Sequence, residues 1–307
     1  MPKYVIGIDV GGTNIKTGIV SQKGVIVARS NLITGSYIRN KMELIEALVE
    51  HLKGLLAANG LKPSQVLGIG IGLPGLIDPP EGIVRFLPNI PGWKNVRLQR
   101  ILEQKLHIPT FLENDVNMIA LGEWRYGAGK RSRNMLCMTL GTGVGGGLIL
   151  NNELYRGPGY VAGEIGHIPL NERGPRCNCG GSACFERAVG HRYLLQKALK
   201  IFHKRNLTLQ DVTSMALAGN KRAVRFWEET AVHIGNALTG VVNVLNPERI
   251  VIGGGVSNCP GFLFRKIQQT IKHRAMSVQG KMARVVKAQL GNDAGLVGAY
   301  VLVKGSC

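Results

Sequence analysis

The first residues of the chain alternate between apolar runs and a glycine-rich turn. Tyr4–Ile8 and Lys16–Val20 are apolar runs of strand length, and a third strand is predicted over Val25–Ala28. Between the first two runs lie Asp9 and the turn-forming segment Gly11–Asn14. The pattern therefore predicts a tight hairpin with a carboxylate at the end of its first strand.

This hairpin is compatible with two interpretations. A Walker loop needs a Gly-Lys-Ser/Thr ending that opens a helix, and a dinucleotide fingerprint also needs a helix start, so both are excluded. In the first interpretation the backbone N–H groups of the turn face a phosphate, and Asp9 holds a cation or its water shell. In the second it is an ordinary glycine hairpin. The stretch alone leaves both open.

Strands and helices alternate in the following residues. Apolar residues recur at helical spacing over Lys41–Ala58, and Gly60 ends this predicted helix. Buried strands are predicted over Val66–Ile71 and Pro109–Leu112, with a helix near Val96–Leu106 between them. This alternation predicts an α/β fold.

The second half of the chain repeats the opening pattern. The apolar strand Met135–Leu140 runs into the glycine-rich segment Gly141–Gly147 and out into Leu148–Leu150. Two such hairpins, one in each of two domains, would clamp a polyphosphate between them. A third cluster, Gly253–Gly255, follows the strand Ile250–Ile252 and a helix predicted near residues 223–245. It either lets the backbone approach a base or ribose or forms a tight strand-to-helix turn.

Composition narrows the class of protein. A chain of 307 residues with 45% hydrophobic content is long enough for two packed domains. The sequence shows no signal peptide and no membrane-spanning apolar run, so we expect a cytoplasmic protein with no membrane partner. The net charge of +19 would suit an anionic partner, but the basic stretches are short and lack interleaved aromatic residues. We therefore expect no nucleic-acid partner.

A group of polar residues follows the Pro109–Leu112 strand. Glu113, Asn114 and Asp115 lie at its carboxyl end, where ligands of α/β sheets gather. A carboxylate there could accept a hydroxyl proton, which is the proton transfer that phosphoryl transfer to an alcohol requires. Alternatively, Asp115 is the N-cap of a helix running from Val116 to Trp124, and both interpretations can hold together.

One imidazole and three thiols lie close together in the second half. They form the ligand set of a closed structural zinc site, although C-x-C is less usual than C-x-x-C and free thiols remain the alternative. A metal that fixes this loop would also fix Glu164 and Glu186 as acceptors for a polyhydroxylated ligand. Exposed glutamates without a ligand are the alternative. The four candidate metal ligands are His167, Cys177, Cys179 and Cys184.

Taken together, these motifs resemble the ROK (repressor, open reading frame, kinase) family of sugar kinases. The resemblance runs in order from Asp9 to about Gly298, and as a set it is highly specific. One departure is Ala183, which stands where the family's cysteine cluster usually has a glycine. The motifs are Asp9-x-Gly11-Gly12-Thr13-Asn14, residues 72–75, 87–93, 113–117 and 140–147, and Glu164-x-Gly166-His167 with the cysteine cluster.

The resemblance implies a two-domain, actin-like ATPase fold of the hexokinase, ribonuclease H-like type. It places residues 1–117 and 291–307 in a small domain and residues 118–290 in a large domain with the zinc loop and dimerisation helices. It further implies transfer of the ATP γ-phosphoryl group to the C6 hydroxyl of a hexose, with Mg²⁺. A homodimer is expected from the family.

The resemblance also implies roles for individual residues. Asp115 would be the general base, and His167 would serve both the zinc and the sugar through its two ring nitrogens. Zinc would be bound by His167 and the three cysteines. Sugar-binding residues would be Gly75, Asn89, Asn114, Asp115, Glu164, His167 and Glu186. Mg·ATP would be bordered by Asp9, Gly11, Gly12, Thr13, Lys16, Thr142, Gly143, Gly254 and Gly255.

Glucose is the favoured hexose, because residues 87–93 and 164–167 look like those of the glucokinase members. Fructose, allose, mannose, N-acetylglucosamine and N-acetylmannosamine remain open, since a single hydroxyl or acetamido contact decides among them. Polyphosphate is an alternative phosphoryl donor, because the net positive charge of the chain would favour a polyanion. The family also contains repressors with a helix-turn-helix ahead of the kinase-like body. Only eight residues precede Asp9 here, so we expect no DNA-reading domain, and a sugar-sensing regulator remains the non-enzymatic alternative.

Overall fold

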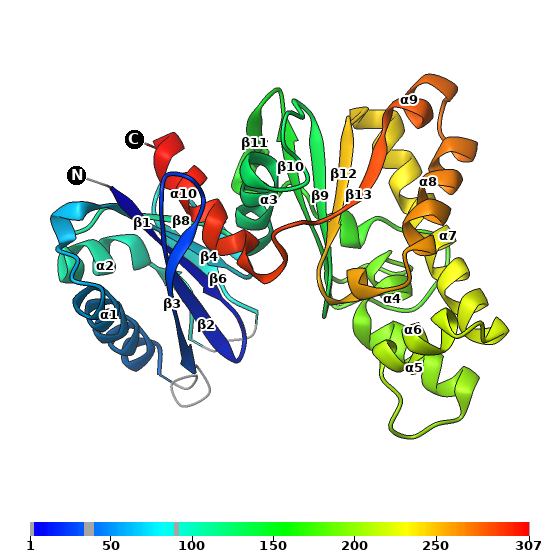
Figure 1. The fold of residues 1–307 in the computed structure, drawn as a ribbon, viewed down its shortest axis with the longest axis horizontal. Helices are drawn as coiled ribbons and strands as arrows, with labels where there is room; N and C mark the ends of the chain where they lie inside the picture. Colours follow the sequence, from blue (N-terminus) through cyan, green and yellow to red (C-terminus); the bar gives the residue numbers. More distant parts are fainter. Residues whose placement is uncertain (1–2, 34–39, 89–91, 307) are drawn as a thin grey trace. The chain divides into compact units, whose positions relative to one another are not determined.

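The computed structural model describes residues 3–33, 40–88 and 92–306. The chain divides into two compact units, each with its own sheet (Figure 1). Unit 1 contains Met1–Arg131, Leu154–Ala162 and Asn292–Cys307, and unit 2 contains Ser132–Glu153 and Gly163–Gly291.

The sheet of unit 1 has the strand order β3-β2-β1-β4-β8. β1 pairs antiparallel with β2, which confirms the predicted strand-to-strand hairpin, whereas β1, β4 and β8 run parallel. β3 continues beyond the predicted strand, to Ile33, because it pairs with the whole of β2. The strands are β1 (Tyr4–Val10), β2 (Asn14–Val20), β3 (Ile26–Ile33), β4 (Val66–Leu73) and β8 (Thr110–Asn114).

The two faces of this sheet differ in side-chain size, and each receives different helices. On β4, isoleucines alternate with glycines; Ile69 and Ile71 are fully buried in a core shared with α1 and α2. The glycine face meets α10, where a Cβ at Gly70 would lie 2.8 Å from the Cβ of Ala299. The bare backbone therefore allows α10 to pack closely on the sheet. The helices are α1 (Lys41–Ala58), α2 (Leu98–Leu106), α3 (Asp115–Tyr126) and α10 (Ala294–Ser306).

α3 and α10 pack against each other within unit 1. The resemblance divides the chain at residue 118, inside α3, whereas the helix lies entirely within unit 1 in the structure. A small antiparallel sheet of β5 (Leu76–Asp78), β6 (Ile83–Phe86) and β7 (Lys94–Val96) completes this unit. Because β7 ends at Val96, α2 begins two residues later than predicted.

The second sheet has the order β11-β10-β9-β12-β13, and its strands β9, β10, β12 and β13 lie in unit 2. β9 and β10 form the second predicted hairpin, but its turn is shorter than predicted, because β10 begins at Val144 and includes Gly145–Gly147. β12 runs parallel to both β9 and β13. The strands are β9 (Met135–Leu140), β10 (Val144–Leu150), β11 (Glu153–Tyr155), β12 (Arg249–Gly253) and β13 (Arg284–Lys287).

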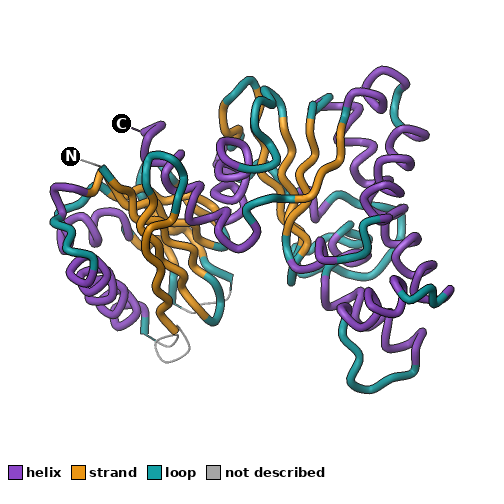
Figure 2. Tube along the Cα trace, viewed as in Figure 1, coloured by secondary structure: helices purple, strands orange, loops and turns teal. Residues whose placement is uncertain are grey.

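Helices pack on this second sheet around one apolar core (Figure 2). The long α7 contributes much of the core, including Phe226 and Trp227, whose rings pack edge to face with centroids 5.2 Å apart. Among the described residues, no helix is both long and apolar enough to cross a lipid bilayer. The helices are α4 (Glu186–Val189), α5 (His191–Phe202), α6 (Leu209–Leu217), α7 (Lys221–Leu245), α8 (Phe262–Arg274) and α9 (Ser277–Met282).

Candidate active site and metal centre

The carboxyl ends of the three parallel strands of unit 1 bring polar residues to one edge. Asp9 on β1 is in register with Gly72 on β4, and Gly72 is in register with Glu113 on β8. Because parallel strands end at the same edge of a sheet, the β1–β2 turn and the β8–α3 junction share it. Two of the sequence-predicted sites in this unit are therefore neighbours.

Asp9 lies largely buried at this edge, next to the first turn of α10. A Cβ at Gly295 would lie 3.6 Å from its carboxyl carbon. Burial raises the pKa of Asp9, and the Lys16 ammonium, 3.6 Å away, opposes this only in part. The adjoining turn exposes Gly12 and Thr13, and Gly11 N–H donates to the Asn14 carbonyl at 3.0 Å. A cation beside this turn would stabilise the ionised Asp9 carboxylate.

The β8–α3 junction positions Asp115 as the first residue of a helix. The Asn114 side chain is the N-cap: its Oδ1 accepts from the backbone N–H groups of Val116, at 2.9 Å, and Asn117, at 3.2 Å. The interpretation of Asp115 as the N-cap is therefore wrong, because Asn114 holds the extended backbone that a cap requires. Asp115 is half-buried, and its Oδ1 accepts from Val116 N–H at 2.9 Å.

A buried carboxylate, that of Glu113, holds this junction through hydrogen bonds and an ion pair. Glu113, only 1% exposed, accepts through Oε1 from Asn114 N–H at 3.0 Å and from Asn117 Nδ2 at 2.9 Å. Its Oε2 accepts from Arg156 Nε at 2.7 Å. Arg156 could not be predicted from the sequence, because nothing local to residues 154–162 signals a partner 43 positions earlier. The ion pair ties that segment to the start of α3.

Two of the sugar-binding candidates of unit 1, Gly75 and Asn114, also lie at this edge. Asn114 Nδ2 donates to the Gly75 carbonyl at 3.4 Å, so these two candidates are in contact. Gly75 has φ 102°, a left-handed conformation that favours glycine. Asn89 lies outside the described residues.

In unit 2 the three-residue turn of the second hairpin lies beside the third glycine cluster. Gly254 has φ 84°, and a Cβ there would collide with the backbone of Leu140, the residue that precedes the turn. Only glycine permits this approach, which brings Gly254 and Gly255 to the same strand ends as Thr142 and Gly143. The residues of this unit that are predicted to border Mg·ATP therefore lie together at the ends of β9 and β12.

Glu186 lies against the same turn. Its Oε2 accepts from the N–H of Val144, at 2.9 Å, at the start of β10. Glu186 is also the first residue of the four-residue helix α4. The structure thus connects the cysteine loop that precedes Glu186 to the second hairpin.

The four candidate metal ligands come together as one cluster. Their donor atoms all lie within 4.8 Å of one another, with His167 Nδ1 3.7 Å from Cys177 Sγ and Cys179 Sγ 3.6 Å from Cys184 Sγ. Burial and the neighbouring thiols raise the pKa of Cys184 to about 12, whereas the N–H of Gly181 lowers that of Cys179. A divalent cation would replace these crowded thiol protons, and three thiolates with one imidazole are a tetrahedral zinc set. The donor set therefore fits zinc.

The position of the His167 ring in the cluster also determines where its second nitrogen, Nε2, lies. With Nδ1 toward the thiols, Nε2 lies 3.7 Å from the Glu164 carboxylate oxygen Oε2. Both residues belong to one short turn, η3 (Ile165–His167) and its N-cap, which explains why they stay together. A metal on Nδ1 would therefore orient Nε2 toward a ligand of Glu164.

Ala183 shows what the departure from the family pattern does to the loop. It has φ 55°, the left-handed conformation that glycine adopts without strain. Its N–H donates to the Pro175 carbonyl at 3.0 Å and its carbonyl accepts from Leu170 N–H at 2.9 Å, so two hydrogen bonds hold the residue there. The loop geometry is kept with a non-glycine residue at this position.

Comparisons with known proteins define first the fold and then the family. The structure superposes on the ROK hexokinase of Thermus thermophilus with a TM-score of 0.84 and 31% identity, covering 99% of this chain and 98% of that one. A ROK family glucokinase of Streptomyces griseus, solved with glucose and AMPPNP, gives 0.82 and 31%, covering 98% and 99%. The chain therefore has the two-domain actin-like ATPase fold predicted from the sequence.

The sequence comparisons lead to the same group of proteins. The glucokinase of Halalkalibacterium halodurans is 36% identical over 316 residues, which cover 98% of this chain and 95% of that protein. The ROK family matches residues 5–306. The chain belongs to the ROK family, which confirms the resemblance drawn from its motifs.

Proposed function

We propose that this protein is an ATP-dependent hexose kinase that transfers the γ-phosphoryl group of ATP to the C6 hydroxyl, with glucose as the favoured acceptor. The observation that carries the proposal is Asp115, a half-buried carboxylate at the carboxyl end of β8. The 36% identity to a glucokinase over nearly the whole chain supports the choice of substrate class.

Asp115 acts as the general base. It lies in the first turn of α3, whose N-terminus carries a partial positive charge. One carboxylate oxygen accepts the C6 hydroxyl proton as the sugar O6–Pγ bond forms and the bond from Pγ to the bridging oxygen of ADP breaks. Asn114 and the Glu113–Arg156 ion pair hold the start of the helix, and hence the carboxylate, in place.

The other predicted residues take the roles that family membership implies. Mg²⁺ neutralises phosphate charge when bound with ATP, and zinc on His167 and the three cysteines stabilises the loop that carries Glu164. Hydroxyl groups of the hexose are held by Gly75, Asn89, Asn114, Glu164, His167 and Glu186. Mg·ATP is bordered by Asp9, Gly11, Gly12, Thr13, Lys16, Thr142, Gly143, Gly254 and Gly255.

The proposal also covers the localisation, the oligomeric state and the partners of the enzyme. We expect a cytoplasmic homodimer that acts on small molecules and has no nucleic-acid partner. A second phosphoryl donor, polyphosphate, is a candidate because of the net charge of +19, which would attract a polyanion. The intact carboxylate at position 115 argues against a sugar-sensing regulator without enzymatic activity.

A coupled assay of ADP release tests the activity and the acceptor together. Glucose, fructose, allose, mannose, N-acetylglucosamine and N-acetylmannosamine are compared as acceptors with ATP as donor, and sugar phosphate formation is compared with polyphosphate as donor. We expect the highest kcat/KM for glucose with ATP. A chain with no activity on any hexose with either donor would refute the kinase proposal.

The role of Asp115 is tested separately. Asp115→Asn should lower turnover by at least about two orders of magnitude while sugar affinity is retained, in line with the usual contribution of a general base. The matched control is Asp211→Asn, which removes an exposed carboxylate from the first turn of α6 and should keep turnover. Retained turnover in Asp115→Asn would exclude this residue as the base.

A further inference from the structure

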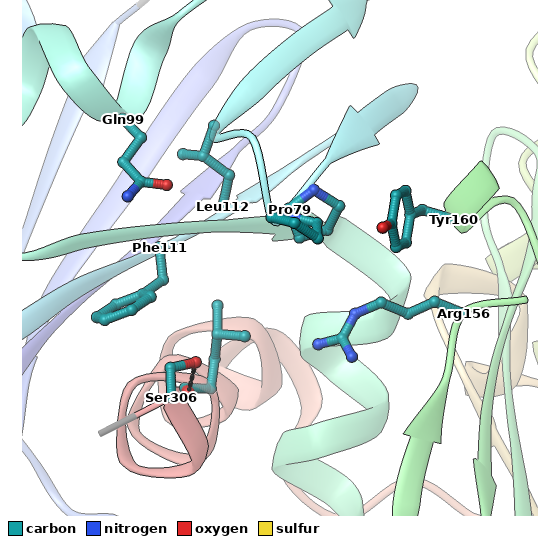
Figure 3. A pocket seen from close by; sticks show the side chains of 9 residues that line it. Pro79, Gln99, Phe111, Leu112, Arg156, Tyr160 and Ser306 are labelled. Atoms are coloured by element: carbon teal, nitrogen blue, oxygen red, sulfur yellow. Dashed lines mark hydrogen bonds between the residues drawn. The ribbon is translucent and has the colours of Figure 1, made fainter. Parts of the chain in front are cut away.

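A pocket of about 340 Å³ lies within unit 1, on the outer side of the edge strand β8. Its volume is at the small end of the range for metabolite sites. Phe111 and Leu112 of β8 form one wall, Arg156 and Tyr160 project from another side, and the last turn of α10 contributes Ser306 (Figure 3). Apart from Arg156, whose ion pair with Glu113 supports the start of α3, these residues have no role in the proposed transfer to a hexose.

Arg156 brings an anion-binding group to this pocket. Its Nε is engaged by the buried Glu113 carboxylate at 2.7 Å, which fixes the plane of the guanidinium group. Within the described part of the chain no acceptor is recorded for its two terminal nitrogens, and the side chain remains 31% exposed. A guanidinium held by one edge offers its other edge to a second oxyanion. The Glu113 carboxylate also accepts from Asn114 N–H and Asn117 Nδ2, so its hydrogen bonds do not depend on Arg156 alone.

Tyr160 is held against the same pocket in a strained backbone conformation. It has φ 61°, which is a rare value for a bulky residue, and its N–H donates to the Gly157 carbonyl at 3.2 Å. The Ala162 N–H closes the turn by donating to the Arg156 carbonyl at 2.9 Å. Strain of this kind persists where a function or a surrounding structure maintains it. The turn orients the arginine and the aromatic ring together.

The remaining lining sets the shape of a ligand. Pro79, Pro80 and Phe111 are apolar, and Gln99 and Ser306 supply polar atoms. The Ser306 hydroxyl donates to the Leu302 carbonyl at 2.9 Å, as Figure 3 shows, so its oxygen can only accept a further bond. The lining therefore combines one strong anion donor with flat apolar surfaces.

We propose that this pocket binds a small phosphate monoester with a flat or ring-shaped body, whose phosphate pairs with the terminal nitrogens of Arg156 and whose body packs on Phe111 and Tyr160. The site is separate from the residues assigned to the hexose and to Mg·ATP, and it stands or falls independently of the proposed kinase activity. It would let the enzyme respond to a phosphorylated metabolite.

Isothermal titration calorimetry on the full chain tests the site with phenyl phosphate as probe. Phenol, which lacks the oxyanion, and inorganic phosphate, which lacks the ring, serve as the two half-probes. We expect phenyl phosphate to bind at least about tenfold more tightly than either half-probe, because both parts of the pocket are then used. Equal affinities for phenyl phosphate and inorganic phosphate, or no detectable binding, would overturn the proposal.

Variants locate the binding. Arg156→Lys keeps a positive charge beside Glu113 but loses the planar guanidinium with its paired N–H donors, and it should weaken phenyl phosphate binding by about tenfold or more. Ser306→Trp fills the pocket from α10 without touching the ion pair and should abolish binding. Arg100→Gln, an exposed arginine of α2 outside the pocket, is the matched control and should leave affinity unchanged. Binding that persists unchanged in Ser306→Trp would place the probe elsewhere and refute the site.

Discussion

The ion pair between Glu113 and Arg156 allows a quantitative test of how the β8–α3 junction is held. Arg156→Gln removes the guanidinium and leaves a carboxylate that is 1% exposed with only two N–H donors, from Asn114 and Asn117. Removing one partner of a buried ion pair costs about 3–5 kcal/mol. Because the arginine is 31% exposed and two donors remain, we expect a smaller effect than this, about 2–3 kcal/mol in the free energy of unfolding.

The double variant Glu113→Gln with Arg156→Gln removes the uncompensated charge. It should be less destabilised than the sum of the two single variants, by about 1–2 kcal/mol, because no buried charge then remains unpaired. Urea denaturation followed by circular dichroism measures all four proteins of the cycle. Arg29→Gln is the matched control, since its pair with Asp293 is exposed at both ends and should contribute less than about 1 kcal/mol.

Two results would refute this reasoning. One is an Arg156→Gln protein within about 0.5 kcal/mol of the wild type, a change typical of an ordinary surface position. The other is a double variant whose destabilisation equals the sum of the single ones, which would mean that Glu113 and Arg156 do not interact energetically.

Three further predictions concern the metal centre, the half-buried His51 and helix packing. Cys179→Ser should yield zinc-poor protein with a lower melting temperature, and full zinc content by mass spectrometry would contradict the ligand assignment. Burial lowers the pKa of His51, whose Nε2 lies 3.0 Å from Thr17 Oγ1, so the folded chain holds that proton less well than the unfolded chain. Stability should therefore fall as the pH drops below about 6.5. In His51→Gln the urea midpoint should change less with pH between about pH 5 and 7, and an unchanged dependence of the midpoint on pH would exclude His51 as the cause. Gly298→Ala should cost about 2–3 kcal/mol by urea denaturation, since its Cβ would overlap the backbone of α3, whereas Gly305→Ala on the same helix meets no atom and should not destabilise; equal effects would refute the packing argument.

Much of the fold follows from local pattern. The period of apolar residues predicts α1 over Lys41–Ala58, as the structure has it, because a helix that buries one face must repeat every 3.6 residues. Both glycine hairpins were recognisable because the turn and its two strands are adjacent in the sequence. The four metal-ligand candidates were recognisable for the same reason, since their spacing alone suggests a shared ion.

Where those elements meet was decided by the tertiary structure. The cap of α3 depends on the backbone angles of Asn114, which the composition of the junction leaves open between that residue and Asp115. The approach of Gly254 to Leu140 depends on the parallel pairing of β12 with β9, strands more than one hundred residues apart. Pairing at such a separation is set by the packing of whole strands, so no local pattern reports it.

The sequence by itself determined the strands of the two glycine hairpins, the parallel strands β4, β8 and β12, the helices α1, α2, α3 and α7, the family and a set of candidate site residues, because these depend on the character and spacing of neighbouring residues. Only the tertiary structure revealed the Glu113–Arg156 pair and the pocket at the edge of β8. Both are assembled from segments distant in the sequence, and contacts of this kind arise only when the strand order and the packing of α10 have been set.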